Sequence, residues 1–259
     1  MTRFAHGTNP ITTALLLAAG TGVRLQPLTD DAPKCLTEVN GITILQRLID
    51  GLCETGFKRL VVVVGYLDGC IREFLSNLDC DLTIEFVSVS KYRTTNNIYS
   101  LWTARRAIEP PFLLVECDLV FDAAMLEPMR TPDRIAVSHI LPWMNGTTVC
   151  INSARQVQRF QLGGCCRPDE AEYKTVNMYS FSPPSWRRVA ARLEQHISAG
   201  RVNAYYETVF AEMVADGSLS LEAVPFDDQC WYEIDTLGDL YEAERLFPGN
   251  SRRSVSGVS

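Results

Sequence analysis

The chain has 259 residues, of which 46% are hydrophobic and 21% are charged, and its formal net charge is −7. This composition is typical of a folded globular protein, and the length suits one large α/β domain or two small ones. The negative balance argues against a nucleic-acid-binding protein with a general basic surface, although a local cationic pocket for a small anion stays open.

The N-terminus and the cysteines bear on the compartment. The first ten residues, MTRFAHGTNP, lack the apolar stretch of an export signal, and the longest apolar runs are far shorter than a membrane span. Nine cysteines without such a signal and without a CxxC pair favour reduced thiols over a zinc ribbon. We therefore expect a cytoplasmic protein with no membrane partner.

Strand and helix patterns alternate in the first half of the chain. Apolar, β-branched runs predict strands, and apolar residues that recur on one helical face predict helices. The predicted strands are 12–18, 59–65, 82–89 and 112–118, and the predicted helices are 44–54, 71–78 and 96–108. This order predicts a mostly parallel, Rossmann-like α/β sheet with helices on both faces. Ligands of such sheets bind at the carboxyl ends of the strands.

After residue 140 the pattern loosens, and we expect a smaller C-terminal elaboration with partly antiparallel strands. The predicted strands are 148–152, 156–164, 175–182, 219–226 and 230–234, and the predicted helices are 182–199, 203–217 and 236–247. We interpret residues 11–247 as a single domain with two intertwined halves, 11–140 and 141–247, followed by a flexible polar tail, 248–259.

The stretch LLLAAGTGVRLQPLTDDAPKCL, residues 15–36, leads from a buried strand through two glycines to two cations. Gly20 and Gly22 allow a sharp turn that brings backbone N–H groups close to phosphate oxygens. Arg24 and Lys34 can add charge-assisted contacts from two sides. The Walker A pattern is absent, and only the first two glycines of the dinucleotide pattern occur. The sequence therefore predicts a phosphate-binding loop of another class.

This loop resembles the signature loop of the sugar-phosphate nucleotidylyltransferase superfamily. Three further stretches, TTNNIYSLWTA, YKTVNMYSFS and WYEIDTLGDLYEAE, resemble segments of CTP:phosphocholine cytidylyltransferases and their phosphonate cytidylyltransferase relatives. The similarity extends over residues 11–247 and implies a fold like that of nucleotide-diphospho-sugar transferases. It implies that CMP is moved from CTP to a small phosphonate or phosphorylated amino alcohol, such as 2-aminoethylphosphonate or phosphocholine, with release of pyrophosphate.

The resemblance implies that residues 11–140 bind the nucleotide. In that family the loop wraps the triphosphate, and the matching residues here are Ala18, Ala19, Gly20, Thr21 and Gly22. Arg24 matches the arginine that contacts the β- and γ-phosphates, and Lys34 matches the lysine that reaches the α-phosphate and the acceptor. For the pyrimidine, the resemblance indicates Gly65, Tyr66, Asn97 and Ser100. A helix cap is a nearly equal alternative for Asn97.

The resemblance also implies a Mg²⁺ site. Asp118 matches an aspartate after the fourth strand, and Glu233 and Asp235 match an acidic pair late in the chain. Mg²⁺ takes oxygen ligands and bridges carboxylates to substrate phosphates. The two late carboxylates are two residues apart on a predicted strand and so share a face. Glu116 is left without a role.

Residues 141–247 are implied to bind the acceptor. Lys174 is expected to hold its phosphate or phosphonate, and with Arg24 and Lys34 it forms the expected catalytic set. Aromatic rings could cage an ammonium group by cation–π contact, and carboxylates could pair with it. The aromatic candidates are Trp143, Tyr173, Tyr206 and Trp231, and the acidic candidates are Glu207 and Asp228.

Two alternatives remain open at this stage. One is a nucleotidyltransferase acting on a sugar phosphate or inositol phosphate, and the other is a nucleotide-sensing domain without turnover. The expected mechanism is in-line attack by an acceptor oxygen that is already anionic, so it requires no general base. The acceptor and the oligomeric state, a homodimer included, are left open.

Overall fold

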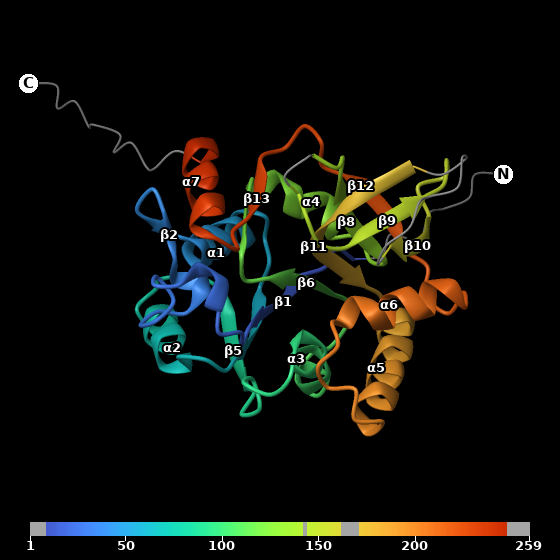
Figure 1. Cartoon of the computed structure of the whole chain (residues 1–259), viewed down its shortest axis with the longest axis horizontal. Helices are drawn as coiled ribbons and strands as arrows, with labels where there is room; N and C mark the ends of the chain where they lie inside the picture. Colours follow the sequence, from blue (N-terminus) through green and yellow to red (C-terminus); the bar gives the residue numbers. More distant parts are fainter. Residues whose placement is uncertain (1–8, 142–143, 162–170, 248–259) are drawn as a thin grey trace, which may run out of the picture.

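The computed structural model describes residues 9–141, 144–161 and 171–247 (Figure 1). The strands are β1 (Thr13–Ala18), β2 (Glu38–Val39), β3 (Ile42–Thr43), β4 (Arg59–Val64), β5 (Thr83–Ser88), β6 (Phe112–Glu116), β7 (Leu119–Phe121), β8 (Arg134–Ser138), β9 (Thr148–Ile151), β10 (Val157–Gln161), β11 (Ala171–Phe181), β12 (Glu222–Pro225) and β13 (Trp231–Glu233). The helices are α1 (Ile44–Glu54), α2 (Asp68–Ser76), α3 (Asn97–Ala104), α4 (Leu126–Met129), α5 (Pro183–Ser198), α6 (Tyr206–Ala215) and α7 (Leu237–Leu246). The predicted tail, 248–259, lies outside the described residues.

Four parallel strands in the order β6-β1-β4-β5 form the first part of a nine-stranded sheet. Residues 61–64 of β4 are completely buried, which explains the continuous apolar run in the sequence. Alternate residues of β1 enter two different cores: Leu15 and Leu17 face α3, α5 and α6, whereas Leu16 and Ala18 face α1, α2 and α4. The predicted α/β sheet with helices on both faces is confirmed.

The second half extends the same sheet in the antiparallel sense. Strand β11 pairs antiparallel with β6, β8 and β9, and β12 joins the edge of β8. The register of β11 against β8 shifts between Thr175 and Tyr179, and Asn177 inside this bulge has a φ of 55°. Such bulges redirect side chains and often lie beside functional sites. Both predicted halves therefore contribute strands to one sheet.

Several expectations about individual elements need correction. Helix α2 spans Asp68–Ser76 instead of 71–78, strand β11 begins at Ala171 instead of 175, and the short elements β2, β3, β7 and α4 were not predicted. The strand β8 was not predicted, because RIAVS is short and its neighbours carry no alternating pattern. Helix α3 ends at Ala104 instead of 108, where the Arg105 guanidinium donates to the carbonyl of Trp102 and the chain turns toward Pro110. Helix α6 begins at Tyr206, three residues later than 203.

Helix α7 closes the fold at one end of the molecule, beside β2 (Figure 1). Thr236 is its N-cap: Thr236 Oγ1 accepts a hydrogen bond from the backbone N–H of Asp239, and the Asp239 carboxylate accepts one from the backbone N–H of Thr236. Ala243 and Phe247 then pack in a small core with Val39 and Ile44. This cap fixes the chain directly after Asp235.

None of the helices in the described ranges is long and apolar enough to cross a membrane. Six cysteines are free thiols in the described part of the chain: Cys35, Cys53, Cys70, Cys80, Cys117 and Cys230. Cys150 is disulfide-bonded, so the expectation of uniformly reduced thiols is wrong at that position.

Candidate active site

The glycine loop follows β1 and is held from behind. Gly22 has a φ of 63°, and a Cβ there would come within 3.0 Å of Thr29 Cγ2. The Thr29 hydroxyl donates to the carbonyl of Gly22 at 2.9 Å. The Tyr66 hydroxyl donates to the carbonyl oxygen of Thr29 at 3.0 Å, and the backbone N–H of Tyr66 donates to the carbonyl oxygen of Ala19 at 3.1 Å. Glycine at 22 is therefore required by both the backbone and the packing.

Gly65 and Tyr66, the two predicted base contacts that follow β4, lie behind this loop. A Cβ on Gly65 would come within 2.9 Å of both the Ala19 carbonyl oxygen and Tyr92 Cβ. Neither residue belongs to the described lining of the cleft in front of the loop. Their contribution in this geometry is to shape and support the loop.

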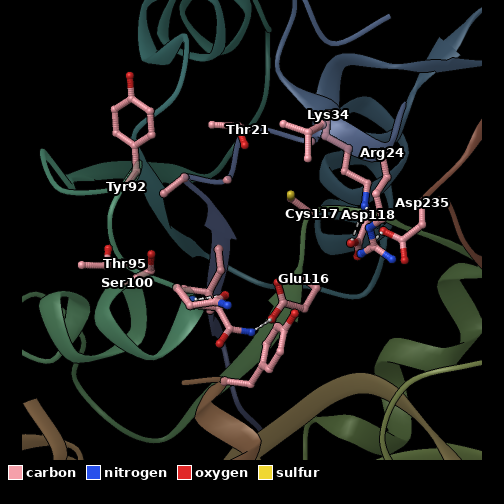
Figure 2. A pocket seen from close by; sticks show the side chains of 18 of the residues that line it. Thr21, Arg24, Lys34, Tyr92, Thr95, Ser100, Glu116, Cys117, Asp118 and Asp235 are labelled. Atoms are coloured by element: carbon pink, nitrogen blue, oxygen red, sulfur yellow. Dashed lines mark hydrogen bonds and ion pairs between the residues drawn. The ribbon is translucent and has the colours of Figure 1, made fainter. Parts of the chain in front are cut away.

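A cleft of about 590 Å³ opens in front of the loop, at the carboxyl ends of β1 and β6 (Figure 2). Its walls include Thr21, Arg24 and Lys34 from the loop region, and Asn97 and Ser100 from α3. In Figure 2 the charged groups gather at one end, and Thr95, Ser100 and Tyr92 lie away from them. The cleft therefore combines a charged end with a less charged wall.

Sequence reasoning missed Tyr92, Arg93 and Thr95, which also line this cleft. Tyr92 and Arg93 stand directly before the TTNNIYSLWTA stretch, and Thr95 is its second residue; all three lie in the connection between β5 and α3. Their position on a connecting segment after a parallel strand is the signal that could have identified them.

The charged end is organised around Lys34. Its ammonium nitrogen lies 2.8 Å from Asp118 Oδ2 and 2.6 Å from Asp235 Oδ1, and Arg24 contacts the same Asp235 oxygen at 2.8 Å (Figure 2). Burial alone would lower the pKa of Lys34, but the charges of Asp118 and Asp235 outweigh it and the pKa is raised. Lys34 therefore keeps its positive charge.

Asp118, Glu233 and Asp235 each present an oxygen within 4.8 Å of the others. A small ribbon brings them together: β13 pairs antiparallel with β7, with Glu233 opposite Leu119, and Ile234 N donates to the Asp118 carbonyl at 2.9 Å. The buried Oδ1 of Asp118 has no hydrogen-bond partner. An oxygen-only donor set with one unsatisfied buried carboxylate oxygen fits a Mg²⁺ ion.

A second compartment, of about 650 Å³, adjoins the first and reaches Lys174. The Lys174 side chain is 3% exposed, and it donates to the Thr175 carbonyl at 2.7 Å and to Glu233 Oε2 at 3.3 Å. Asn177 Nδ2 donates to the other oxygen, Glu233 Oε1, at 3.2 Å. Lys174, just before the bulge in β11, and Asn177, inside it, thus both contact a predicted metal ligand.

Asn177 is the most informative residue that sequence reasoning missed. It stands within the quoted YKTVN stretch, yet nothing in the pattern indicates its left-handed backbone. Asparagine is among the few non-glycine residues that adopt this conformation readily.

Two further carboxyl groups lie in the floor of this compartment. Burial, together with the charges of Asp118 and Glu207, raises the pKa of Glu116. Burial raises the pKa of Glu207 to about 7, although its hydrogen bonds and the charge of Lys174 oppose the shift.

Asn97 links α3 to β6 and α6 by hydrogen bonds: its Nδ2 donates to Glu116 at 3.4 Å, and its Oδ1 accepts from the N–H of Tyr206 at 3.0 Å. The cap of α3 is Asn96, whose side chain accepts from Asn97 N.

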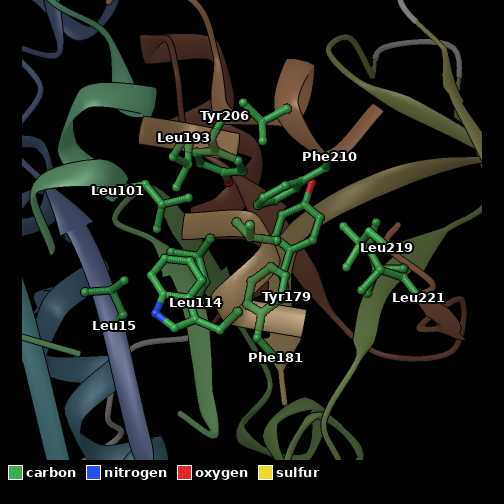
Figure 3. Close-up of a cluster of buried hydrophobic side chains, with 14 of the residues drawn as sticks. Leu15, Leu101, Leu114, Tyr179, Phe181, Leu193, Tyr206, Phe210, Leu219 and Leu221 are labelled. Atoms are coloured by element: carbon green, nitrogen blue, oxygen red, sulfur yellow. The ribbon is translucent and has the colours of Figure 1, made fainter. Parts of the chain in front are cut away.

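The aromatic candidates do not assemble into a cage in the described part of the chain. Tyr206 is fully buried, packed edge-on against Tyr179 at 5.8 Å (Figure 3), and Tyr173 stacks on His139 at 5.0 Å. Trp231 is 8% exposed and lines a small pocket that adjoins the second compartment and shares Lys174 and Glu233 with it. Asp228 is exposed outside both compartments, and Trp143 lies outside the described residues. Glu207 is therefore the acidic candidate that lines the compartment.

The chain was compared with known proteins. CMP-5'-(3-aminopropyl)phosphonate synthase of Streptomyces rubellomurinus is 30% identical over 243 residues, covering 90% of this chain but only 38% of that protein. Choline-phosphate cytidylyltransferase of Streptococcus pneumoniae is 33% identical over 235 residues, covering 90% of this chain and 97% of the relative. The chain thus spans well under half of the first relative and nearly all of the second.

The fold agrees with a solved structure of CTP:phosphocholine cytidylyltransferase from Streptococcus pneumoniae. The TM-score is 0.78 at 21% identity, and the match covers 91% of this chain and 98% of the other. The model of the MobA-like NTP transferase domain matches residues 14–146, which include the glycine loop, Arg24, Lys34 and Asp118. The chain therefore belongs to the MobA-like NTP transferase family and is a nucleotidyltransferase.

Proposed function

We propose that this enzyme transfers CMP from CTP to a small phosphonate or phosphate-ester acceptor and releases pyrophosphate. The observation that carries the proposal is the shared wall between two compartments: Arg24, Asn97, Glu116, Asp118 and Asp235 line both. A nucleotide in the first compartment and an anion at Lys174 in the second would meet at these groups. The relatives named for aminopropylphosphonate and choline phosphate support this acceptor class.

The loop residues and their neighbouring cations would bind the triphosphate. Backbone N–H groups of residues 19–22 can donate to phosphate oxygens, whereas the predicted contact Ala18 is buried at the end of β1 and does not line the cleft. Arg24, 64% exposed, is free to turn toward the β- and γ-phosphates. Lys34 would neutralise charge at the α-phosphate, from a position that its two aspartate partners restrict. Ser100 and Asn97 would line the base or ribose end.

Asp118, Glu233 and Asp235 would hold Mg²⁺. When bound there, the ion supplies positive charge and orientation for the phosphates. The protein contributes the geometry of these three carboxylates, which Lys174 and Asn177 restrain through Glu233.

Lys174 would position the acceptor anion. An acceptor oxygen attacks the α-phosphorus, a new P–O bond forms, and the bond to the β-phosphate oxygen breaks, so that pyrophosphate leaves with its electron pair. The acceptor oxygen is already anionic, so no proton has to be removed. Catalysis then consists of positioning and charge neutralisation, to which Arg24, Lys34 and Lys174 contribute their positive charges.

Pyrophosphate release with CTP, Mg²⁺ and a panel of acceptors tests this proposal. We expect turnover with aminoalkylphosphonates or phosphorylated amino alcohols, and a preference for CTP over ATP and GTP. Asp118→Asn and Asp235→Asn should each lower kcat at least about hundredfold with the fold intact, whereas the exposed Asp79→Asn should not. Turnover with sugar phosphates alone, or equal use of purine triphosphates, would contradict the assignment.

A further inference from the structure

The acceptor compartment has an unusual balance of charge. In the proposed complex Arg24 turns toward the β- and γ-phosphates of the nucleotide, and Asp118, Glu233 and Asp235 hold the metal. The remaining charged groups in the described lining are one ammonium, Lys174, and three carboxyl groups, Glu116, Glu172 and Glu207. A dianionic acceptor alone would leave this excess of carboxyl groups uncompensated, so the compartment suits a ligand that also carries positive charge.

Glu207 is the carboxyl group of this set that has an unsatisfied buried oxygen. Glu207 is 7% exposed and lines the compartment at the start of α6. Its buried Oε2 atom has no hydrogen-bond partner. A buried carboxylate oxygen without a donor is costly, so its retention points to a ligand that supplies one. Lys174 and Glu207 line the same compartment, so one ligand there can contact both.

The chemistry of the lining distinguishes two kinds of cationic head group. A quaternary ammonium has no N–H to donate and is recognised by aromatic faces. A primary ammonium has three N–H donors and is recognised by carboxylate and carbonyl oxygens. Among the described residues that line this compartment, the one aromatic ring is Tyr205, which is 61% exposed and so forms no enclosed cage.

We propose that the acceptor is a zwitterion with a primary ammonium group, that Glu207 receives this ammonium, and that Lys174 holds the phosphonate or phosphate at the other end. Glu207 is thereby the residue that discriminates a primary amine from a trimethylated one. This inference rests on the proposed function, because it specifies the acceptor of the same reaction.

Glu116 and Asn97 complete the recognition. Asn97 Nδ2 already donates to Glu116, so the Asn97 amide fixes that carboxyl group beside the head group. Glu172 is different: it is exposed at the rim, and its Oε1 already accepts from Thr148 at 2.7 Å. Glu172 is therefore a matched control, with the same charge and the same compartment but no buried, unsatisfied oxygen.

The test compares 2-aminoethylphosphonate with its N,N,N-trimethyl analogue, by calorimetric binding and by kcat/KM with CTP. We expect the primary amine to bind at least about tenfold more tightly, and Glu207→Gln to reduce this ratio about tenfold with CTP affinity unchanged. Glu172→Gln should change the ratio by less than about threefold. The isosteric amide keeps the size of the side chain, so a purely steric preference would survive Glu207→Gln.

Equal or tighter binding of the trimethyl analogue by the wild-type protein would overturn the inference, as would an unchanged ratio in a folded Glu207→Gln variant. The wild-type comparison needs no variant, so it decides the matter even if Glu207→Gln does not fold. If neither compound yields pyrophosphate with CTP, the transfer reaction fails, and the binding ratio still decides which head group the compartment selects.

Discussion

The ammonium nitrogen of Lys34 lies 2.6 Å from Oδ1 of Asp235, although 201 positions of sequence separate the two residues. The contact joins the segment after the glycine loop to the end of the β13 ribbon, and Asp118 joins it at 2.8 Å. Side-chain exposures of 10% for Lys34 and 9% for Asp235 make this a nearly buried ion pair. Breaking such a pair is costly because the remaining charge has no partner.

Lys34→Met should therefore affect both stability and turnover. We expect the free energy of unfolding without Mg²⁺ to fall by about 3 kcal/mol, because Asp118 loses its cation and Asp235 keeps only the exposed Arg24. Added Mg²⁺ should then raise the melting temperature of Lys34→Met more than that of the wild type. Calorimetric melting with EDTA and with Mg²⁺ measures this. A variant as stable as the wild type in EDTA would contradict the structural role of Lys34, whatever its activity.

Lys174→Ala should impair the acceptor and spare the nucleotide. Losing one charge-assisted contact of about 1.5–3 kcal/mol predicts at least about a tenfold rise in acceptor KM or fall in kcat. Calorimetric titration with CTP should give an affinity close to that of the wild type, and the exposed Lys58→Ala serves as the control. Loss of CTP affinity with an unchanged acceptor KM would show that Lys174 binds the nucleotide and not the acceptor.

Asn177 offers a test in which backbone and side chain can be separated. Asn177→Ala keeps a β-carbon at a φ of 55° and removes the amide that donates to Glu233, whereas Asn177→Gly removes both the amide and the β-carbon. We expect Ala to lower the free energy of unfolding by about 1 kcal/mol more than Gly. Both should lower kcat, by about tenfold, because Glu233 loses the same hydrogen bond. Wild-type kcat in both variants would exclude a positioning role for Asn177.

The raised pKa of Glu207 predicts a pH dependence of stability. Burial raises this pKa from 4.5 to about 7, so between these values the folded state binds more protons than the unfolded state. Stability from this group is therefore present below about pH 4.5 and is lost as the pH rises through about 7, by an amount on the order of 2–3 kcal/mol.

Denaturant unfolding of the wild type and Glu207→Gln, in EDTA at pH 5 and pH 8, measures this difference. The free energy of unfolding of the wild type should fall relative to that of the variant on going to pH 8. The difference between the two proteins isolates Glu207 from Glu116, whose carboxyl group titrates in both. A constant difference across this range would show that Glu207 has an ordinary pKa.

The parallel half of the sheet and the glycine loop could both be predicted from local sequence patterns. Strands such as 59–64 are covered on both faces, so local composition reports their burial directly, and Gly22 is required by its own backbone angle. The loop pattern indicated Arg24 and Lys34, and the resemblance to nucleotidylyltransferase motifs indicated Asp118 and Asp235; these four residues line the cleft together.

Which residues line the acceptor compartment could not be read from local sequence, because it depends on long-range strand pairing and helix packing. The bulge that turns Asn177 toward Glu233 depends on the pairing of β11 with strands far away in sequence, and no local pattern encodes that register. Tyr206 and Glu207 are neighbours at the start of α6, and either could have faced the ligand. Tyr206 packs in the aromatic core, and Glu207 lines the acceptor compartment. Packing against α5 and β11 made that choice, because a helix directs successive side chains about 100° apart and its apolar stripe must face the core.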